Sequence, residues 1–264
     1  MKPIYHFAFL LLIFVGFNSC KNKDGGVNIF SIDDDKKLGL QVSQQIAADP
    51  ATYPILSEAD YPQSYTYLRA IRDRILNSGK LNHKDDFVWD VKIIRSDTTL
   101  NAFCTPGGYI YVYSGIIKYL DTEDELAGVM GHEMAHADRR HSTDAMTEQY
   151  GIQTLVAIVL GKNQNALASL ATNLLELKYS RKNEAEADEY SVIYLSATPY
   201  QCNGAAGFFE KLTASGSSGN TPEFLSTHPN PDNRIQAIND KAASIGCNTS
   251  PSGFNYNDFK NSLP

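Results

Sequence analysis

The chain has 264 residues, of which 42% are apolar and 20% are charged. This composition excludes an intrinsically disordered chain, a collagen-like repeat and a disulfide-dense miniprotein. Acidic residues outnumber basic ones by 30 to 23, and no run of Lys and Arg reaches four residues. The sequence therefore predicts no nucleic-acid partner, because binding a phosphate backbone needs a clustered basic surface.

The first residues have the pattern of an export signal. Lys2 precedes nine consecutive apolar residues, 7–15. Such a run suits a signal peptide and is too short to cross a bilayer, which takes about 20 apolar residues. The run leads to Cys20 and a polar stretch, as in a bacterial lipoprotein. We therefore predict a lipoprotein signal over 1–19, a lipidated Cys20 that anchors the protein to the membrane, and a tether over 20–35. The alternative is an ordinary secretory signal in which Cys20 is incidental.

The rest of the chain contains many predicted helices and two predicted strands. Apolar residues at helical spacing predict helices over 33–48, 65–76, 152–160, 166–194, 205–212 and 230–243, with a short one around 115–120. Another helix opens at Asp121 or Thr122 and runs through His132 and His136. Alternating β-rich segments predict strands over 87–94 and 109–113. We expect one folded domain over 36–250, a flexible loop over 215–220, and an irregular polar tail over 251–264.

Three cysteines lie beyond the predicted signal and Cys20. Cys202 and Cys247 flank the C-terminal third of the chain, and an exported protein sits where disulfides persist. These two residues either form a disulfide or remain unpaired. Cys104 is then expected to be a small buried residue without chemistry.

The strongest chemical pattern is His132-Glu133-Met134-Ala135-His136. Positions four apart lie on one face of a helix, so both imidazoles can reach one cation. Glu133 flanks that face and can contact a water molecule beside the metal. The alternative is a helix that exposes solvated His and Glu side chains.

A catalytic zinc ion takes three protein ligands and leaves one position open. The metzincin pattern is excluded, because Arg139 and Ser142 stand where it has Gly and His. His141 would lie about 140° around the helix from His136 if the helix continued, so we expect it to have a structural or capping role.

Glu184 is a better candidate for the third ligand. Glu184 and Asp188 are four residues apart on a predicted helix. Glu184 can bind the metal while Asp188 accepts a proton from a ligand histidine. Spacing alone is equally consistent with a solvated charged face. Glu186 projects about 200° away from Glu184, and we expect it to be solvated.

The chain resembles the zinc metallopeptidases of family 48, which include HtpX, BepA, LoiP and the CAAX prenyl endopeptidase. The resemblance rests on segments in the right order, namely Asn101–Val112, Gly131–His136, Arg140-His141, Ser180–Asp188 and Ser226–Ile235. Because we find neither transmembrane helices nor room for a helical-repeat domain, we expect it to be most similar to the stand-alone lipoprotein members.

This resemblance implies a fold and a metal site. The fold is α+β and mostly helical, a gluzincin-type zincin domain with a small sheet from residues 87–113 beside the helix of His132. The resemblance makes His132, His136 and Glu184 the ligands of one zinc ion, and Glu133 the general base. It also implies that Asp188 supports a ligand histidine, in the first place His132.

Substrate contacts also follow from the resemblance. In the family, a segment corresponding to Asn101, Gly107 and Gly108 precedes an edge strand beside the cleft. We therefore expect Tyr109, Ile110 and Tyr111 to pair with an extended peptide by strand addition. The alternative is a plain core hairpin.

Two further residues match the family near the C-terminus. His228 either polarises the oxyanion, closes the fourth zinc position in a resting state, or is a satisfied loop histidine. Arg234 is expected to hold that loop through a carboxylate pair.

The predicted function is a zinc metalloendopeptidase that cleaves unfolded or misassembled proteins of the bacterial cell envelope. The predicted location is the outer membrane, facing the periplasm. The alternative is a latent or chaperone-like binding module in which His228 closes the zinc site.

Overall fold

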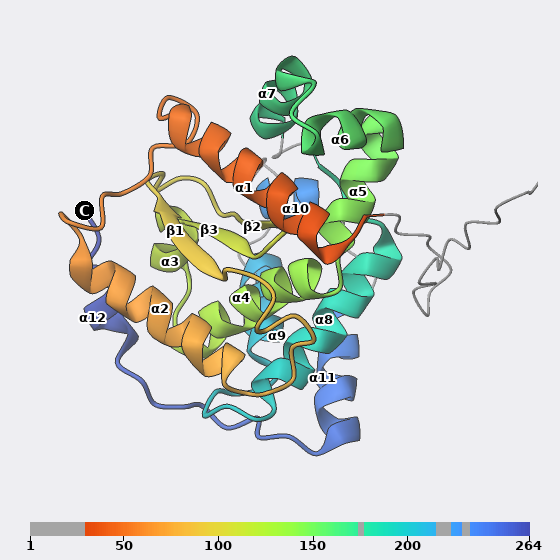
Figure 1. The fold of residues 1–264 in the computed structure, drawn as a ribbon. Coiled ribbons are helices and arrows are strands. Elements are labelled where there is room, and N and C mark those ends of the chain that lie inside the picture. The colour runs from red at the N-terminus through yellow and green to blue at the C-terminus, as the bar shows by residue number, and fades with distance from the viewer. Residues whose placement is uncertain (1–29, 174–176, 215–222, 229–232) are drawn as a thin grey trace, which may run out of the picture.

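The computed structural model describes residues 30–173, 177–214, 223–228 and 233–264. The predicted signal, Cys20 and the loop over 215–220 lie outside the described residues. The described chain is mostly helical with one small sheet, as the sequence predicts (Figure 1). Within it, no helix combines the length and the apolar character needed to span a bilayer.

The elements follow in this order: α1 (Ile32–Ala48), α2 (Pro62–Leu76), β1 (Asp90–Ile94), β2 (Ala102–Thr105), β3 (Tyr109–Tyr113), α3 (Ser114–Tyr119), α4 (Glu123–Asp138), α5 (His141–Tyr150), α6 (Ile152–Val159), α7 (Gln164–Thr172), α8 (Arg181–Leu195), α9 (Gly204–Ala214), α10 (Glu223–Thr227), α11 (Arg234–Ile245) and α12 (Tyr256–Asn261).

The sheet has the strand order β1-β3-β2. β1 runs parallel to β3, and β2 pairs with β3 antiparallel. Gly107 and Gly108 make the turn between β2 and β3 with φ values of 75° and 85°, a region that favours glycine. Because β3 has a partner on both sides, the expectation that Tyr109, Ile110 and Tyr111 form an edge strand is wrong. β2 is an edge of this sheet.

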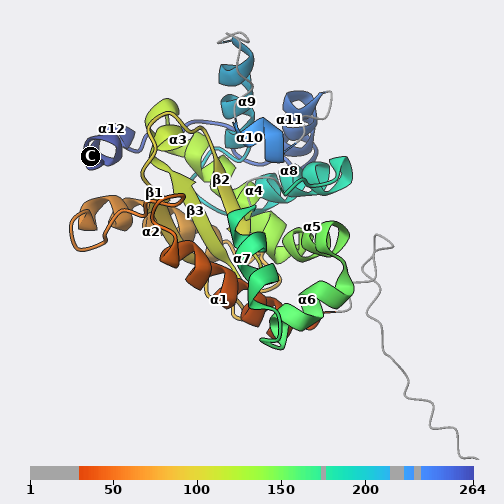
Figure 2. The same cartoon turned by 90° about the horizontal axis from the view of Figure 1, so that it is seen from above.

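Alternating side chains of β3 divide the interior into two apolar clusters. Ile110 and Val112 belong to the cluster that includes α2, α4 and α8. Tyr111 and Tyr113 belong to the cluster that includes α1, α6 and α7. The sheet therefore lies between α1 on one face and α4 on the other, as both views show (Figures 1 and 2). Successive residues of a strand point to opposite faces, which explains the division.

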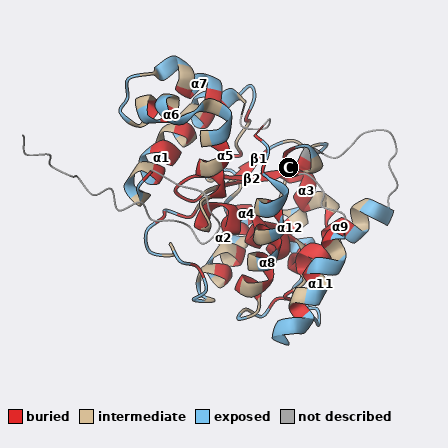
Figure 3. Cartoon of the chain, turned by 90° about the vertical axis from the view of Figure 1, so that its right-hand side faces the viewer, coloured by how far each residue is buried: buried red, intermediate tan, exposed pale blue. Residues whose placement is uncertain are grey.

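Helix α4 lies at the centre of the larger cluster. It packs against α8, α9 and β2. Figure 3 shows α4 almost wholly buried, whereas α6, α7 and α11 each present an exposed face. A helix buried on all sides can place its polar side chains only in an internal site, so the histidines of α4 face the interior.

The domain begins earlier than the sequence predicts. Ser31 caps α1 and shares a reciprocal capping box with Asp34. Phe30 and Asp35 are both buried. The residues from Phe30 to Asp35 therefore belong to the folded domain and not to the tether.

The tail is also part of the fold. Residues 251–264 were expected to be irregular, but they include α12. Tyr256 and Phe259 of that helix are buried, and Tyr256 donates a hydrogen bond from its hydroxyl to the carbonyl of Ile117. An aromatic pair at helical spacing thus fixes the tail to the domain.

Three other predicted elements end or begin elsewhere. The strand predicted over 87–94 starts only at Asp90, because Trp89 has a φ of 46°. The helix predicted over 166–194 is two helices, α7 and α8, with Ser180 as the N-cap of the second. The described part of the helix predicted over 230–243 begins at Arg234, after the left-handed residue Asn233.

The pairing of Cys202 and Cys247, which the sequence left open, is present as a disulfide with an S–S distance of 1.98 Å. Cys104 is a free thiol and is buried. Burial raises the pKa of this thiol well above its usual value, which disfavours the nucleophilic thiolate.

Candidate metal centre

The site is built on α4, which is held close to its neighbours by small residues. The hydroxyl of Thr122 caps the helix by accepting from the amide of Glu125. A side chain at Gly128 would place its Cβ 2.1 Å from the amide nitrogen of Ala205 on α9. Ser191 on α8 donates its hydroxyl to the Gly128 carbonyl at 2.9 Å. Helices α8 and α9 therefore approach α4 closely, and α8 can bring its carboxylates to the histidines.

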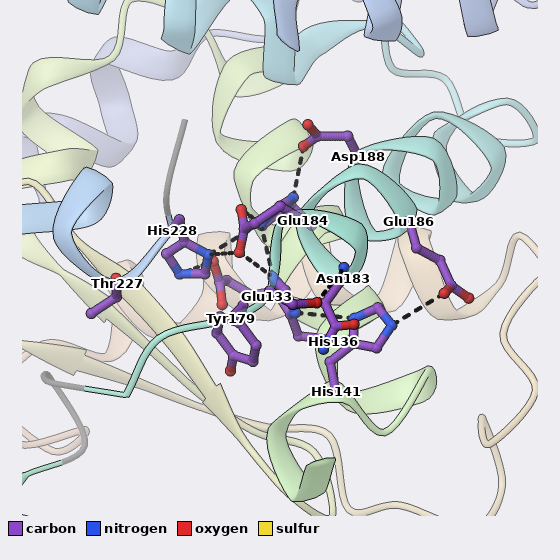
Figure 4. A network of polar contacts seen from close by, with 12 residues as sticks. Glu133, His136, His141, Tyr179, Asn183, Glu184, Glu186, Asp188, Thr227 and His228 are labelled. Atoms are coloured by element: carbon purple, nitrogen blue, oxygen red, sulfur yellow. Dashed lines mark hydrogen bonds and ion pairs between the residues drawn. The ribbon is translucent and has the colours of Figure 1, made fainter. Parts of the chain in front are cut away.

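Four potential metal donors meet in the interior. They are His132 and His136 of α4, Glu184 of α8, and His228, which directly follows α10. Their donor atoms all lie within 4.8 Å of one another. His132 Nε2 lies 3.0 Å from His136 Nε2, and Glu184 Oε1 lies 3.3 Å from His136 Nε2. Figure 4 shows Glu184 and His228 converging from different elements.

This arrangement fits a zinc ion. Tetrahedral zinc with ligands at 2.0–2.1 Å has donor atoms about 3.3 Å apart, close to the observed separations. Two neutral imidazole nitrogens at hydrogen-bond distance can share at most one proton. His228 Nδ1 completes the group of facing atoms, 2.9 Å from Glu184 Oε1 and 3.3 Å from His132 Nε2. One cation at the centre of these four atoms would be bound by a lone pair of each.

Glu133 lies next to the cluster and is fully buried. Neither of its carboxylate oxygens has a hydrogen-bond partner in the described chain, and Oε1 lies 3.5 Å from His228 Nε2. Burial raises the pKa of Glu133, although the neighbouring histidines oppose this shift. A buried carboxylate with raised basicity, free to accept a proton, suits a general base.

His132 is supported from α8, as the sequence anticipates. Asp188 Oδ1 lies 2.9 Å from His132 Nδ1. Burial and Arg234 lower the pKa of His132, but Asp188 and Glu184 outweigh them and raise it to about 9. Burial also disfavours the charge of Glu184, yet the surrounding histidines hold the pKa of Glu184 well below its usual range. The carboxylates Glu184 and Asp188 of α8 and the histidines around them thus stabilise each other's charged forms.

Arg234 links α11 to two carboxylates of α8. It is the first residue of α11 and is buried. Its Nε donates to Asp188 Oδ2 at 2.6 Å, and its Nη2 lies 2.9 Å from Glu184 Oε2. The predicted carboxylate pair is present with Asp188, and Glu184 is a second carboxylate partner of Arg234.

Two residues on the other side of the site depart from the geometry of a continuous helix. His141 lies outside the four clustered donors, but it is not turned away from His136, because its Nδ1 lies 3.1 Å from His136 Nδ1. Glu186 was expected to be solvated, but it pairs with Arg139 at 2.6 Å. The reason is that α4 stops at Asp138 instead of continuing. The left-handed turn at Arg140, with a φ of 64°, begins a new helix at His141.

Tyr179 encloses the site, and no sequence pattern indicated it. Its ring stacks on His136 with centroids 3.7 Å apart. Ser142 Oγ donates to the carbonyl of Cys104 in β2 at 3.0 Å and lies 3.1 Å from the hydroxyl of Tyr179. Since His132, Glu133 and His136 are almost completely buried as well, the described residues form a closed site.

The predicted substrate residues are not gathered at the cluster. Gly107 and Gly108 pack against Lys36 of α1 and against Trp89. Asn101, just before the edge strand β2, is buried, and its Nδ2 has no partner among the described residues. Of the predicted substrate-binding residues, Asn101 alone combines the sheet edge with an unused donor.

Comparison with known proteins agrees with this site. Residues 62–242 match the model of peptidase family M48. The mitochondrial metalloendopeptidase OMA1 of Schizosaccharomyces pombe is 29% identical over 215 residues, which cover 80% of this chain and 62% of that protein. The beta-barrel assembly-enhancing protease of Yersinia pestis is 28% identical over 229 residues, which cover 80% of this chain and 44% of that protein.

A third relative matches a shorter stretch of this chain than the first two, at a higher identity. The metalloprotease YcaL of Escherichia coli is 34% identical over 154 residues, covering 55% of this chain and 59% of that protein. The chain thus spans between 44% and 62% of the length of these three relatives.

Proposed function

The chain belongs to peptidase family M48, and on that premise we propose that it is a zinc-dependent metalloendopeptidase. The observation that carries this proposal is the cluster of His132, His136, Glu184 and His228, with the carboxylate of Glu133 beside it making no hydrogen bond among the described residues. A structural metal site has no use for a buried carboxylate without hydrogen bonds next to its ligands, whereas a hydrolytic site needs a base there.

In this proposal, His132, His136 and Glu184 hold the metal. Bound zinc supplies Lewis acidity that polarises the scissile carbonyl and lowers the pKa of the attacking water. Glu133 accepts the proton of that water and passes it to the leaving amine. Asp188 and Arg234 keep His132 and Glu184 in place. His228 Nε2, 3.5 Å from Glu133, is positioned to donate a hydrogen bond to the developing oxyanion.

The proposed substrate is an extended segment of an unfolded or misassembled protein of the cell envelope. Edge strand β2 and the unused amide of Asn101 support binding of a peptide by strand addition. The Cys104 carbonyl of that strand now accepts from Ser142, so a peptide would have to displace this contact.

The proposed location rests on the sequence. A lipoprotein signal over 1–19 and a lipidated Cys20 would anchor the chain to a bacterial envelope membrane, and we place it at the outer membrane, facing the periplasm. The name of one relative, the beta-barrel assembly-enhancing protease, is in keeping with quality control of envelope proteins.

A latent or chaperone-like role is the second candidate, and one contact favours it. His228 Nδ1 lies 2.9 Å from Glu184 Oε1 and 3.3 Å from His132 Nε2. His228 could therefore serve as a fourth ligand. Four protein ligands would close the open position that hydrolysis requires.

The test is cleavage of casein by the full chain with zinc, compared with the Glu133→Gln variant at equal zinc content. We expect the variant to keep its zinc and to lose at least about 100-fold in rate, because the base is gone and the ligands are intact. Cleavage by Glu133→Gln at the wild-type rate would refute the mechanism.

The His228→Ala variant separates the two candidates. If the wild type binds zinc without cleaving and His228→Ala cleaves, the site is latent. If the wild type cleaves and His228→Ala is slower, His228 assists the reaction and the latent role is rejected.

A further inference from the structure

The turn after α4 brings His141 against His136, one of the proposed metal ligands. Helix α4 ends at Asp138, and the left-handed residue Arg140 redirects the chain so that α5 starts at His141. The ring of His141 meets that of His136 edge-on, with centroids 5.2 Å apart and an interplanar angle of 72°. His141 is 3% exposed, so water does not compete for its ring nitrogens.

The proton positions follow from what each nitrogen faces. His136 Nε2 points to the other donors, and as a metal ligand it must keep its lone pair there. The proton of neutral His136 is then on Nδ1 and needs an acceptor. The acceptor in reach is Nδ1 of His141, at 3.1 Å. His141 must in turn carry its own proton on Nε2.

That second proton also has a partner. His141 Nε2 lies 3.4 Å from Glu186 Oε2. Glu186 is held by the Nε of Arg139 at 2.6 Å, and the guanidinium of Arg139 lies over the ring of Tyr190 at 4.4 Å. Figure 4 shows Glu186 directed at His141, on the side of the site opposite His228.

The two histidines of α4 are thus supported in different ways by the same helix. Asp188 of α8 contacts Nδ1 of His132 directly. Glu186 of α8 reaches Nδ1 of His136 only through His141. We infer that His141 is a positioning residue, which accepts the Nδ1 proton of His136, fixes its tautomer for metal binding and is itself oriented by Glu186. This inference rests on the proposed zinc site.

The test measures zinc affinity, not catalysis. In the full chain, His141→Phe keeps the ring volume and removes the acceptor, so the dissociation constant for zinc should rise about 10- to 100-fold in competition with a chromogenic chelator. His141→Asn places a carbonyl oxygen near the position of Nδ1, and should restore most of the affinity. Equal zinc affinity of His141→Phe and the wild type would overturn the inference.

Tyr194→Phe is the matched control. It removes a buried hydrogen bond of 2.6 Å to Asp138, at the same end of α4, without touching a proposed ligand. We expect it to lower stability and to leave zinc affinity unchanged. If Tyr194→Phe weakens zinc binding as much as His141→Phe does, a general loosening of α4 explains the effect and the inference fails.

A second measurement does not depend on any variant folding. Two-bond correlation spectra of ring nitrogens in the zinc-bound wild type report the tautomers of His136 and His141. We expect the proton of His136 on Nδ1 and that of His141 on Nε2, and a proton on Nδ1 of His141 would overturn the inference, because that nitrogen could not then accept. A wild type that binds no zinc would overturn the proposed function together with it, whereas zinc binding that is insensitive to His141 would leave the proposed function intact.

Discussion

Arg234 and Asp188 form a two-point ion pair, with Nε 2.6 Å from Oδ2 and Nη2 2.8 Å from Oδ1. Both side chains are buried. The same Oδ1 faces Nδ1 of His132. One carboxylate therefore links α11, α8 and the metal site, and its charge has two separate duties: it neutralises a buried guanidinium and it orients an imidazole.

Asp188→Asn should impair both duties. We expect zinc affinity to fall about 10-fold, because the amide supports His132 less well than the carboxylate. We expect the free energy of unfolding of the zinc-free protein to fall by about 3 kcal/mol, the lower end for a broken buried ion pair, because Arg234 keeps only Glu184 as a carboxylate partner. Chelator competition and urea unfolding measure the two effects.

The double variant Asp188→Asn/Arg234→Met distinguishes the two duties. Removing the guanidinium should recover much of the lost stability without recovering zinc affinity. If Asp188→Asn binds zinc as tightly as the wild type, the proposed support of His132 is incorrect.

The relations within the site that can be predicted from the sequence are those between residues of the same helix. His132 and His136 share one face of α4, and Glu184 and Asp188 share one face of α8, since four residues make little more than one turn. These relations hold inside a single helix and do not depend on how helices pack. The same reasoning fails for His141, because it assumes that α4 continues past Asp138.

Other errors concern relations between elements. The pattern of Tyr109 to Tyr113 identifies a strand, but strand order depends on which other segments pair with it, and no periodicity encodes that. Tyr179 reaches His136 only because the chain is not helical just before α8. Its neighbour Ser180 is an N-cap residue, which in hindsight is the one local signal of that break.

The Cys202–Cys247 disulfide gives a prediction about stability alone. It closes a loop over a sequence separation of 45 residues. Replacing both cysteines with Ala should lower the free energy of unfolding by about 4 kcal/mol, because the unfolded chain regains the entropy of that loop. Urea unfolding at pH 7 measures this change.

We expect the same double alanine variant to bind zinc as tightly as the wild type. The disulfide joins the segment before α9 to the segment after α11, and neither cysteine is among the four clustered donors. Cys104→Ala is the matched control, since it also removes a sulfur atom but opens no loop. A double alanine variant that unfolds at the same urea concentration as Cys104→Ala would contradict the prediction.

Glu58 gives a prediction about pH. Its carboxylate accepts from Arg69 of α2 at 2.5 Å and from Lys92 of β1 at 2.9 Å. The hydrogen bonds from Arg69 and Lys92 lower the pKa of Glu58 below its ordinary value of 4.5. A lowered carboxylate pKa stabilises the fold at pH values above the unfolded-state pKa, and this gain is lost as pH falls from 4.5 through the folded-state pKa.

Because the side chain is 40% exposed, Glu58→Gln should cost only about 0.5 kcal/mol at pH 7. The difference in unfolding free energy between zinc-free wild type and variant should shrink below pH 4.5, and also in 1 M salt at pH 7, where exposed charges are screened. A difference that stays constant from pH 7 to pH 3.5 would show that the Glu58 charge contributes nothing, and that packing of the side chain explains the effect.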